Sequence, residues 1–409
     1  MLKGRPTVLI VATMDTKGEE TLHLKSCLMG EGVQVVVLDA GIRGTSPYPV
    51  TINREKVASA AGKSLKGVQT LGHEGKALEI MTSGATACTL ELYDSGSIKG
   101  VICLGGSMGT TLGTAVMRAL PIGFPKVMIS TMASRNTRPF VGTKDIMMLH
   151  SVCDLSGINR ITQKILRNGA LALAGMVKGS DLKTHSVKPL VVLSTLGTTE
   201  ACAVKVRTEL EAKGNEVIIF HTVGSGGEAL EETVKAGEVN AVVELSLHEL
   251  ADHLFGGDYD AGPDRGKGAL QLKIPTVLVP GNVDFLVTGP IHQAQQHFPG
   301  RNYHVHNAAI TVVRTEREEM VKLARVFAGL CNHAGGPLAI LVPLGGFSAF
   351  DRKGGPLHDP EAPRLFSDIL KEELKRDIPL HELPYHINDE EFAGEVLRNL
   401  DTIWHSNAE

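Results

Sequence analysis

The sequence predicts an α/β protein with two Rossmann-like parallel-sheet subdomains and a nucleotide cleft. Three observations carry this prediction. Short apolar runs, typical of strands buried on both faces, alternate with helical patterns. Several of these runs end in glycine or hydroxyl residues, at the position where open α/β sheets bind ligands. The order of strands and turns in the first part of the chain then recurs in the second part.

The most informative stretch is residues 99–120, KGVICLGGSMGTTLGTAVMRAL. Its apolar run over 101–104 predicts a buried strand, and the apolar spacing over 112–120 predicts a helix. The glycine turn between them presents free backbone N–H groups and the positive end of a helix dipole, which favours a phosphate site. A tight turn without a ligand is the alternative, and no Walker A motif is present. The candidate phosphate-binding residues are Gly105, Gly106, Ser107, Gly109, Thr110 and Thr111.

The chain begins with a predicted buried strand over Thr7–Ala12. Thr16 and Glu19 have the spacing of a capping box, which predicts a helix from Thr16 to about Gly30. The turn before this helix lies at the carboxyl end of the strand, although its acid and hydroxyl residues are also ordinary helix caps. The candidate ligand-binding residues here are Asp15, Thr16 and Lys17.

A second strand is predicted over Val33–Leu38, ending at Asp39. An acid at this position often binds a ribose hydroxyl, and it can equally be a turn residue. Residues 53–93 are predicted to be mainly helical, with a glycine break near 67–75. Further strands are predicted over Lys126–Ser130 and over 145–149, followed by a helix over 159–176. The loop after the first of these strands is rich in hydroxyl groups and supplies the candidates Ser130, Thr131, Ala133 and Ser134.

Composition excludes several classes of function. The aromatic content of 4% and the net charge of −4 disfavour binding of nucleic acid or of a membrane surface. No apolar run is long enough to span a bilayer or to form a signal peptide. The six cysteines are scattered without a CxxC pair, so we expect reduced thiols in a cytoplasmic protein, with neither a disulfide nor zinc needed for folding.

The strand and turn pattern starts again near residue 189. Thr13 corresponds to Thr195 and Gly32 to Gly214, and VQVVVLDAGIRG resembles NEVIIFHTVGSGG. We therefore predict two similar halves, an ATP-binding subdomain over 1–183 and a second subdomain over 184–409, with a polar linker near 179–188. The second half lacks the glycine turn, because residues 244–249, ELSLHE, stand in its place.

The second half carries polar groups in loops after its strands. The segment HTVGSGGEA fits a dinucleotide fingerprint, which makes NAD binding there an alternative, but it follows the second strand of its unit, whereas such a fingerprint should follow the first. The segment 256–265, GGDYDAGPDR, is predicted as an exposed turn or substrate loop. His304 and His306 share one face of a strand, where they are either zinc ligands without a visible third partner or structural histidines. The last helix, over 389–404, carries an apolar stripe that is a packing or dimer face.

Seven residues of the second half are predicted to bind a second ligand without anchoring ATP. They share a position in loops or strand ends that can line a ligand cleft. Among them, Asp351 and His358 are possible general acid or base groups, and Asp359–Pro360 is also a common way to enter a helix. The seven are His221, Asn282, Asp284, Arg301, His306, Asp351 and His358.

The stretch GGSMGTTLGTAVMRALPIGFPKVMISTMAS, together with ATMDTKGEE, HTVGSGG, GRNYHVHN and PLGGFSAFD, resembles the Tm-1-like ATP-binding domain family, named after a plant tobamovirus-resistance protein. The resemblance covers nearly the whole chain. It implies two Rossmann-like subdomains, ATP with Mg²⁺ bound mainly by the first, and self-association, for which we expect a homodimer. It supplies no catalytic residues, because the family has no settled reaction.

From these observations we expect a cytoplasmic protein that uses ATP on a small polar metabolite. The alternative is a non-catalytic nucleotide-binding module that controls a partner protein, as the inhibitory role of the plant relative suggests. The two are separated by turnover, because an enzyme releases ADP or AMP faster when its metabolite is added.

Overall fold

The computed structural model describes residues 5–44, 46–179 and 187–405 of the 409-residue chain. The chain divides into two compact units, Met1–Thr184 (unit 1) and His185–Glu409 (unit 2), and each unit is described by itself. The linker predicted over 179–188 lies largely outside the described residues. Among the helices of the described ranges, none combines the length and the apolar character needed to cross a membrane.

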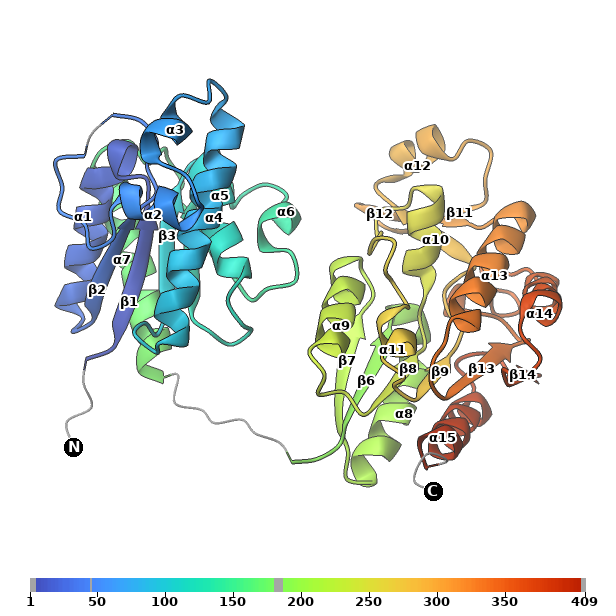
Figure 1. Ribbon diagram of the computed structural model, residues 1–409. Helices are drawn as coiled ribbons and strands as arrows, with labels where there is room; N and C mark the ends of the chain where they lie inside the picture. The colour runs from blue at the N-terminus through green and yellow to red at the C-terminus, as the bar shows by residue number, and fades with distance from the viewer. Residues whose placement is uncertain (1–4, 45, 180–186, 406–409) are drawn as a thin grey trace. The chain divides into compact units, whose positions relative to one another are not determined.

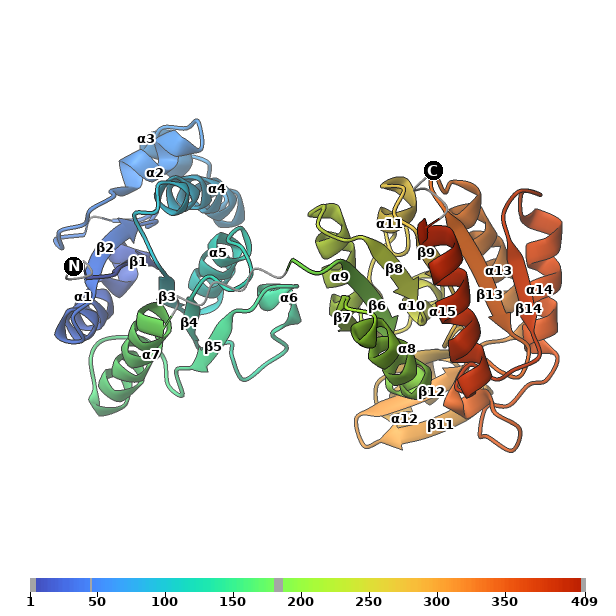
Figure 2. The same cartoon turned by 90° about the horizontal axis from the view of Figure 1, so that it is seen from below.

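Unit 1 is built around one parallel sheet of five strands in the order β2-β1-β3-β4-β5. Figure 1 labels β1, β2 and β3 of this sheet, and Figure 2 labels β4 and β5 as well. The strands are β1 (Thr7–Ala12), β2 (Gln34–Asp39), β3 (Val101–Gly105), β4 (Lys126–Ser130) and β5 (Met147–His150). The helices are α1 (Met14–Gly30), α2 (Arg54–Ala60), α3 (Leu65–Gln69), α4 (Glu74–Asp94), α5 (Ser107–Arg118), α6 (Arg138–Val141) and α7 (Arg160–Gly179).

Helices cover both faces of this sheet, as Figure 2 shows. On one face, α1 and α7 bury apolar side chains against the strands, and on the other α2, α4 and α5 do so. Because both faces are covered, the central strands are apolar throughout: all five residues of β3 are buried. The strand order reverses between β1 and β3, so the loops after these two strands diverge and leave a crevice at the carboxyl edge of the sheet.

The structure confirms the predicted fold class, and most predicted elements of unit 1 lie within a few residues of their expected bounds. The strand over Lys126–Ser130 has the predicted limits. The strand expected over 145–149 begins only at Met147, because the Asp145 side chain accepts a hydrogen bond from Lys126 Nζ (2.6 Å) and from Gly123 N (2.8 Å). Asp145 is thus held in the turn before the strand.

The predicted capping box of Thr16 and Glu19 is wrong. The helix begins two residues earlier, at Met14, and the residue before it, Thr13, is extended. The Thr16 hydroxyl lies 2.9 Å from the Thr13 hydroxyl instead of capping a later turn. Lys17 has non-helical backbone angles (φ −128°, ψ 23°), so residues 14–16 form a separate first turn, which the spacing of Thr16 and Glu19 cannot reveal.

Unit 2 contains a parallel sheet of six strands in the order β14-β13-β9-β8-β6-β7. Its strands are β6 (Leu190–Thr195), β7 (Glu216–His221), β8 (Ala241–Glu244), β9 (Thr276–Leu278), β13 (Leu338–Pro343) and β14 (Leu380–Leu383). The first four strands follow the order of β1 to β4, which agrees with the predicted internal similarity.

An antiparallel sheet in unit 2 was not predicted. Its strands, in the order β10-β12-β11, are β10 (Phe285–Thr288), β12 (Ile310–Arg314) and β11 (Tyr303–Asn307). It lies in the chain between β9 and β13, so the second half is more than a copy of the first. The insertion was missed because short apolar runs such as FLVT and ITVVR do not by themselves reveal which strand they pair with.

The helical elements of unit 2 also cover both faces of the parallel sheet. They are η1 (Gly197–Thr199), α8 (Glu200–Ala212), α9 (Ser225–Lys235), α10 (His248–Phe255), α11 (Gly268–Gln271), α12 (Ile291–His297), α13 (Arg317–Asn332), η2 (Ala349–Asp351), α14 (Ala362–Glu373) and α15 (Glu390–His405). In α15 the predicted stripe is Phe392, Val396, Leu400 and Trp404. The first three are buried against α8 and the sheet, and Trp404 packs there partly buried. The stripe is therefore a packing face within the unit.

Close packing between α2 and α4 depends on Gly84. A Cβ atom at this position would lie 1.9 Å from the Val57 carbonyl oxygen, so alanine forces the two helices apart. We expect Gly84→Ala to lower the free energy of unfolding of unit 1 by about 2–3 kcal/mol. Gly175→Ala, on an exposed helical position with open space around it, should instead raise it by about 0.5–1 kcal/mol. Denaturant unfolding followed by circular dichroism measures both, and an equal effect of the two variants would contradict this account.

Candidate functional site

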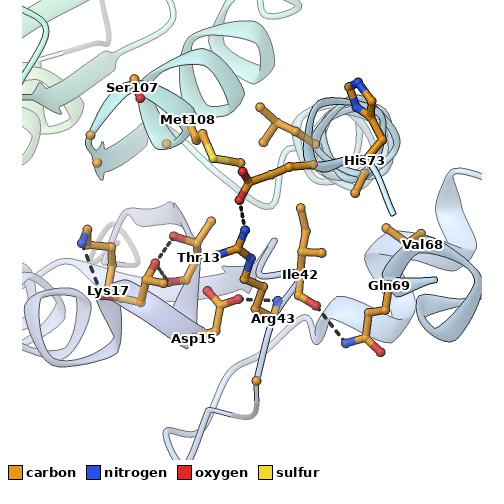
Figure 3. Close-up of a pocket in the computed structure, with 18 of the residues that line it drawn as sticks. Thr13, Asp15, Lys17, Ile42, Arg43, Val68, Gln69, His73, Ser107 and Met108 are labelled. Carbon is orange, nitrogen blue, oxygen red and sulfur yellow. Dashed lines mark hydrogen bonds and ion pairs between the residues drawn. The ribbon is translucent and has the colours of Figure 1, made fainter. Parts of the chain in front are cut away.

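A pocket of about 760 Å³ lies in the crevice of unit 1 where the strand order reverses. Three segments line it: residues 13–17 after β1, residues 42–44 after β2, and residues 105–109 at the end of β3 and the start of α5. Part of α3 and the first turn of α4 close the remaining side. Figure 3 shows Ser107 and Met108 on α5 across the pocket from Thr13 and Lys17. The volume is within the range of small-molecule sites.

The first turn of α5 is the main anion-binding feature of this pocket. Gly106 is its N-cap, and no side chain of the described residues caps the helix there. The first backbone N–H groups of a helix have no partner within the helix, so those of α5 remain available at the pocket, together with the positive end of the dipole. Lys17 adds the only lysine ammonium among the residues that line the pocket.

The three glycines of this turn have different structural roles. A Cβ atom at Gly105 would lie 2.7 Å from Gly109 Cα, and one at Gly109 would lie 3.2 Å from the Leu104 carbonyl oxygen. Both glycines are therefore needed for the close approach of the strand to the helix. A Cβ atom at Gly106 would meet nothing closer than the Thr131 hydroxyl at 3.9 Å, so the fold itself leaves room there for a side chain or a ligand.

Asp15 fixes the neighbouring loop of the pocket. Its Oδ2 atom accepts a hydrogen bond of 2.7 Å from the backbone N–H of Arg43. The Arg43 guanidinium forms an ion pair with Glu74 at the start of α4, and Gln69 Nε2 donates to the Ile42 carbonyl oxygen (2.8 Å; Figure 3). These contacts join the loop after β2 to α3 and α4 and so build one wall of the pocket.

The structure brings half of the predicted nucleotide-binding residues into this pocket. Those that line it are Asp15, Thr16, Lys17, Gly105, Gly106, Ser107 and Gly109. Of the others, Thr110 and Ser130 are buried and lie 2.6 Å apart through their hydroxyl groups, beneath the turn. The Thr111 hydroxyl donates to the Ser107 carbonyl oxygen within the helix. Thr131, Ala133 and Ser134, in the loop after β4, are not among the lining residues.

Asp39 does not line the pocket either, contrary to its predicted contact with a ribose. It is buried, and its Oδ1 atom accepts hydrogen bonds from Met14 N (3.0 Å) and Gly41 N (2.8 Å). Burial raises the pKa of this carboxyl group, and the two backbone hydrogen bonds oppose that rise. Asp39 therefore satisfies a backbone donor of the first turn of α1, which is a structural role.

The pocket wall formed by Arg43, Gln69, His73 and Glu74 was missed from the sequence. The glycine break near 67–75 was recognised, and it is where α3 ends and α4 begins. The break gave no sign that these helix ends return to the ligand edge of the sheet. These helix ends reach the pocket because of the way α4 packs on α2 and α5. The sequence pattern does not reveal this packing.

The predicted second-ligand residues fall into separate places in unit 2. Asp284, Asp351 and His358 come together: the Arg314 guanidinium lies 3.6 Å from Asp284 Oδ2 and 3.8 Å from Asp351 Oδ1, and His358 Nδ1 lies 2.8 Å from the Asp351 carbonyl oxygen. Arg314 was missed because it ends an unpredicted strand.

Asn282 belongs to a different network. Its Oδ1 atom accepts a hydrogen bond from the Thr198 hydroxyl (2.6 Å), and its Nδ2 atom donates to the Ser246 hydroxyl (2.8 Å). These residues follow β9, β6 and β8, so their hydrogen bonds join the loops where the strand order of unit 2 reverses. The position that forms the pocket in unit 1 is thus bridged by polar side chains in unit 2.

The remaining predicted residues do not join these groups. Arg301 is engaged by Glu319 (2.6 Å) and Glu316 (3.2 Å), which gives it a structural role. His221 is exposed at the end of β7, and His306 is exposed on β11, 6.4 Å from the Phe350 ring. Among the described residues, no group of three metal-binding side chains is present around the histidines.

The segment 256–265 is not simply an exposed loop, because it ends in a completely buried arginine. Arg265 bonds to Glu244 through both terminal nitrogens (2.6 and 2.7 Å) and to Glu249 through Nε (2.6 Å), and Glu231 lies 3.5 Å away. Glu249 Oε1 in turn accepts the N–H groups of Gly224 (2.6 Å) and Gly227 (3.1 Å). The Glu249 carboxylate therefore accepts the hydrogen bonds that the backbone of the glycine-rich fingerprint would otherwise offer to a ligand.

Comparisons with known proteins agree on one family. The model described as the "Uncharacterised protein family (UPF0261) N-terminal domain" matches residues 6–182, and the model of its C-terminal domain matches residues 188–404. A UPF0261 protein of Clostridium tetani is 38% identical over 96% of this chain and 98% of its own length. The tomato protein named "ToMV resistance protein Tm-1(GCR237)" is 33% identical over 96% of this chain, which spans 55% of the tomato protein.

Among solved structures, MurG of Acinetobacter baumannii aligns over 97% of this chain and 99% of its own chain, with 12% identity and a TM-score of 0.24. A UDP-N-acetylglucosamine 2-epimerase of Rickettsia bellii aligns over 98% and 97%, with 11% identity and a TM-score of 0.22. At these scores the two alignments carry no argument about activity.

The Asp284 carboxyl group should make the stability of unit 2 depend on pH. Burial, and next the charge of Asp351, raise the pKa of Asp284 to about 7. Between pH 4 and pH 7 the folded state then binds a proton at Asp284 that the unfolded state has lost, so this group's contribution to stability falls as pH rises. We expect the unfolding free energy of the wild type minus that of Asp284→Asn to decrease over this range, by up to about 1.4 kcal/mol per pH unit.

The fluorescence of Trp404, the single tryptophan, reports urea unfolding of unit 2 at each pH. A free-energy difference that stays constant or increases from pH 4 to pH 7 would show that Asp284 is ionised in the folded protein throughout this range.

Proposed function

We propose that this chain, which belongs to the UPF0261 family of uncharacterised proteins, binds ATP with Mg²⁺ in unit 1 and uses it as an enzyme on a small polar metabolite. The observation that carries the proposal is the first turn of α5, which no side chain of the described residues caps and which opens into the 760 Å³ pocket. Backbone donors at a helix N-terminus are suited to phosphate groups.

The phosphates are proposed to lie over Gly106 and the first turn of α5. The absence of a Cβ atom at Gly106 lets a phosphate approach the backbone closely, and the hydroxyl of Ser107 lies in the same turn. On the opposite side of the pocket the Lys17 ammonium supplies a positive charge. Its Nζ atom lies 3.4 Å from the Thr16 carbonyl oxygen, a weak contact that a phosphate oxygen can replace.

The residues of the pocket fit a magnesium ion that arrives with the nucleotide. Asp15 uses Oδ2 for the Arg43 N–H, which leaves Oδ1 available, and the Thr16 hydroxyl lies nearby in the lining. Mg²⁺ in nucleotide sites is usually held by one or two protein oxygens, phosphate oxygens and water. When bound, the ion would neutralise phosphate charge, and Asp15 is the residue that would hold it.

The base of the nucleotide is proposed to lie against the wall formed by α3 and α4. Val68, Ala77 and Leu78 give this wall an apolar surface, and Ile42 extends it from the loop after β2. Gln69 adds an amide whose nitrogen is held by the Ile42 carbonyl oxygen, which leaves its oxygen as an acceptor for a base amino group. This combination of apolar surface and one fixed polar group is typical of small-molecule sites.

The alternative function is a non-catalytic nucleotide-binding module that controls a partner protein. The observation in its favour is the similarity to the tomato ToMV resistance protein, of which this chain spans about half. Adding candidate polar metabolites while measuring release of ADP or AMP separates the two functions. Faster release with a metabolite supports the enzyme, and ATP binding without metabolite-dependent turnover across the panel supports the module. Cytoplasmic location and a homodimer remain predictions.

Substitution at Gly106 tests the position of the phosphates. We expect Gly106→Val to keep the fold, because a Cβ atom at this position meets no close neighbour, and to weaken MgATP binding at least tenfold, which is about 1.4 kcal/mol. Gly175→Val is the matched control, since it adds the same side chain to an open position on α7 of the same unit. Isothermal titration calorimetry measures both. If folded Gly106→Val binds ATP as the wild type does, the phosphates are not placed here.

Substitution at Lys17 tests the electrostatic part of the site. Lys17→Met should weaken MgATP binding by about tenfold and should reduce the dependence of affinity on salt concentration, because one charged contact is lost. Lys25→Met, a change of the same kind on the same helix but outside the pocket lining, is the control. An equal effect of the two substitutions would indicate only a change in net charge.

A further inference from the structure

Arg314, at the end of β12, has an unused hydrogen-bonding edge in the interior of unit 2. The residue is only 8% exposed, and its Nη1 atom donates to the Asp284 carbonyl oxygen (3.0 Å). Its Nε and Nη2 atoms are shielded from solvent and have no hydrogen-bond acceptor within the described ranges. On a guanidinium these two groups point to the same side as a planar fork, the arrangement that binds two neighbouring oxygen atoms.

The adjacent Asp284 side chain has an unused oxygen as well. Its Oδ2 atom accepts a hydrogen bond from the Ser348 hydroxyl (2.7 Å), whereas its Oδ1 atom is buried and has no partner among the described residues. Asp351 differs, because its two oxygens accept from Asp359 N (2.9 Å) and Phe347 N (3.1 Å). The unused groups of the cluster are therefore one two-pronged donor and one oxygen.

Leaving these three atoms unpaired is costly. A buried polar group without a partner costs about 1–3 kcal/mol, and more if it is charged. Three such atoms on two neighbouring residues make this cluster suited to a polar molecule that can supply the missing hydrogen-bond partners. Asp359 is the half-exposed member of the cluster, and its Oδ2 atom lies 3.7 Å from Arg314 Nη2, beyond hydrogen-bond distance.

The charges of the cluster decide which ligand it suits. Three acidic side chains already lie within 4 Å of the single Arg314 charge, those of Asp284, Asp351 and Asp359 at 3.6, 3.8 and 3.7 Å. A further anion would meet repulsion in a poorly solvated place and gain little from a cation that is already balanced. A neutral molecule with neighbouring oxygen atoms meets neither obstacle.

We propose that Arg314 and Asp284 form a binding site for a neutral polyhydroxy compound, such as a sugar or polyol. Two adjacent oxygens of the ligand accept hydrogen bonds from Nε and Nη2 of Arg314, and one ligand hydroxyl pairs with Asp284 Oδ1. Each unpaired atom of the cluster then has a partner, and no charge is added. This site goes beyond nucleotide binding, since it lies in the other unit and does not depend on ATP.

Binding of simple neutral and anionic probes to the full chain tests the proposal. With D-ribose and erythritol as neutral probes, saturation-transfer NMR titrations without nucleotide should show saturable binding. Arg314→Lys keeps the positive charge but loses the fork, so it should weaken that binding at least tenfold. Arg317→Lys, at an exposed arginine three residues further on, is the matched control and should leave it unchanged.

Three outcomes of these titrations would overturn the proposal. They are no saturable binding of either polyol, equal binding by folded Arg314→Lys, and binding of acetate or inorganic phosphate at the same site tenfold or more tightly than the polyols. Because no nucleotide is present, none of these results bears on the ATP site. Conversely, a loss of ATP binding in Gly106→Val would leave the polyol titrations and their interpretation unchanged.

A crystal structure of the wild type with D-ribose keeps the test decisive if Arg314→Lys fails to fold. That failure can occur because a buried charge pair that loses one partner is strongly destabilised. Two sugar oxygens on the Nε and Nη2 edge would support the proposal. An edge filled by the Asp359 carboxylate, or by ordered water alone, would overturn it.

Discussion

The backbone N–H groups at the starts of helices are the constraint on which both units depend. Parallel sheets place several helix starts at one edge, and each start carries donors that the helix itself cannot satisfy. In unit 1, Asp39 accepts the N–H of Met14 at the start of α1. In unit 2, Glu249 accepts the N–H groups of Gly224 and Gly227 at the start of α9. No described side chain does this for α5, which opens into the pocket.

The contrast between α5 and α9 explains why two similar glycine-rich segments have different roles. The segment at α9 fits a dinucleotide fingerprint in sequence, yet a Cβ atom at Gly226 would lie 1.7 Å from the His221 carbonyl oxygen. This glycine is thus required by packing. The anion position beside it is occupied by Glu249, which Arg265 holds with Glu244 and Glu231. Burying one arginine among three glutamates removes these groups from water, which is unfavourable. Loss of Arg265 would leave the three glutamates without their cation in the interior.

Much of the fold could be predicted from the sequence because buried parallel strands and glycine turns have local signatures. The strand over Lys126–Ser130 and the turn at Gly105 and Gly106 are examples. The part of the pocket built from Arg43 and Glu74 could not, because it depends on how α4 packs.

In unit 2 the sequence indicated polar residues near the sheet edge but not their partners. Asp284, Asp351 and His358 were recognised, whereas Arg314 was missed because its strand belongs to an antiparallel sheet that short apolar runs do not reveal. Arg301 looked similar in sequence and proved to be engaged by two glutamates. Only the three-dimensional packing reveals which of the two arginines has N–H groups without a hydrogen-bond acceptor.

Hydrogen–deuterium exchange of the full chain with and without MgATP tests the central claim most directly. Free N–H groups at the start of a helix exchange rapidly, and a bound phosphate should protect them. The account predicts that MgATP slows exchange at residues 106–110 and 13–17 of unit 1 and leaves residues 224–228 of unit 2 unchanged. Saturating MgATP that binds without slowing exchange at residues 106–110, or that protects only unit 2, would contradict it.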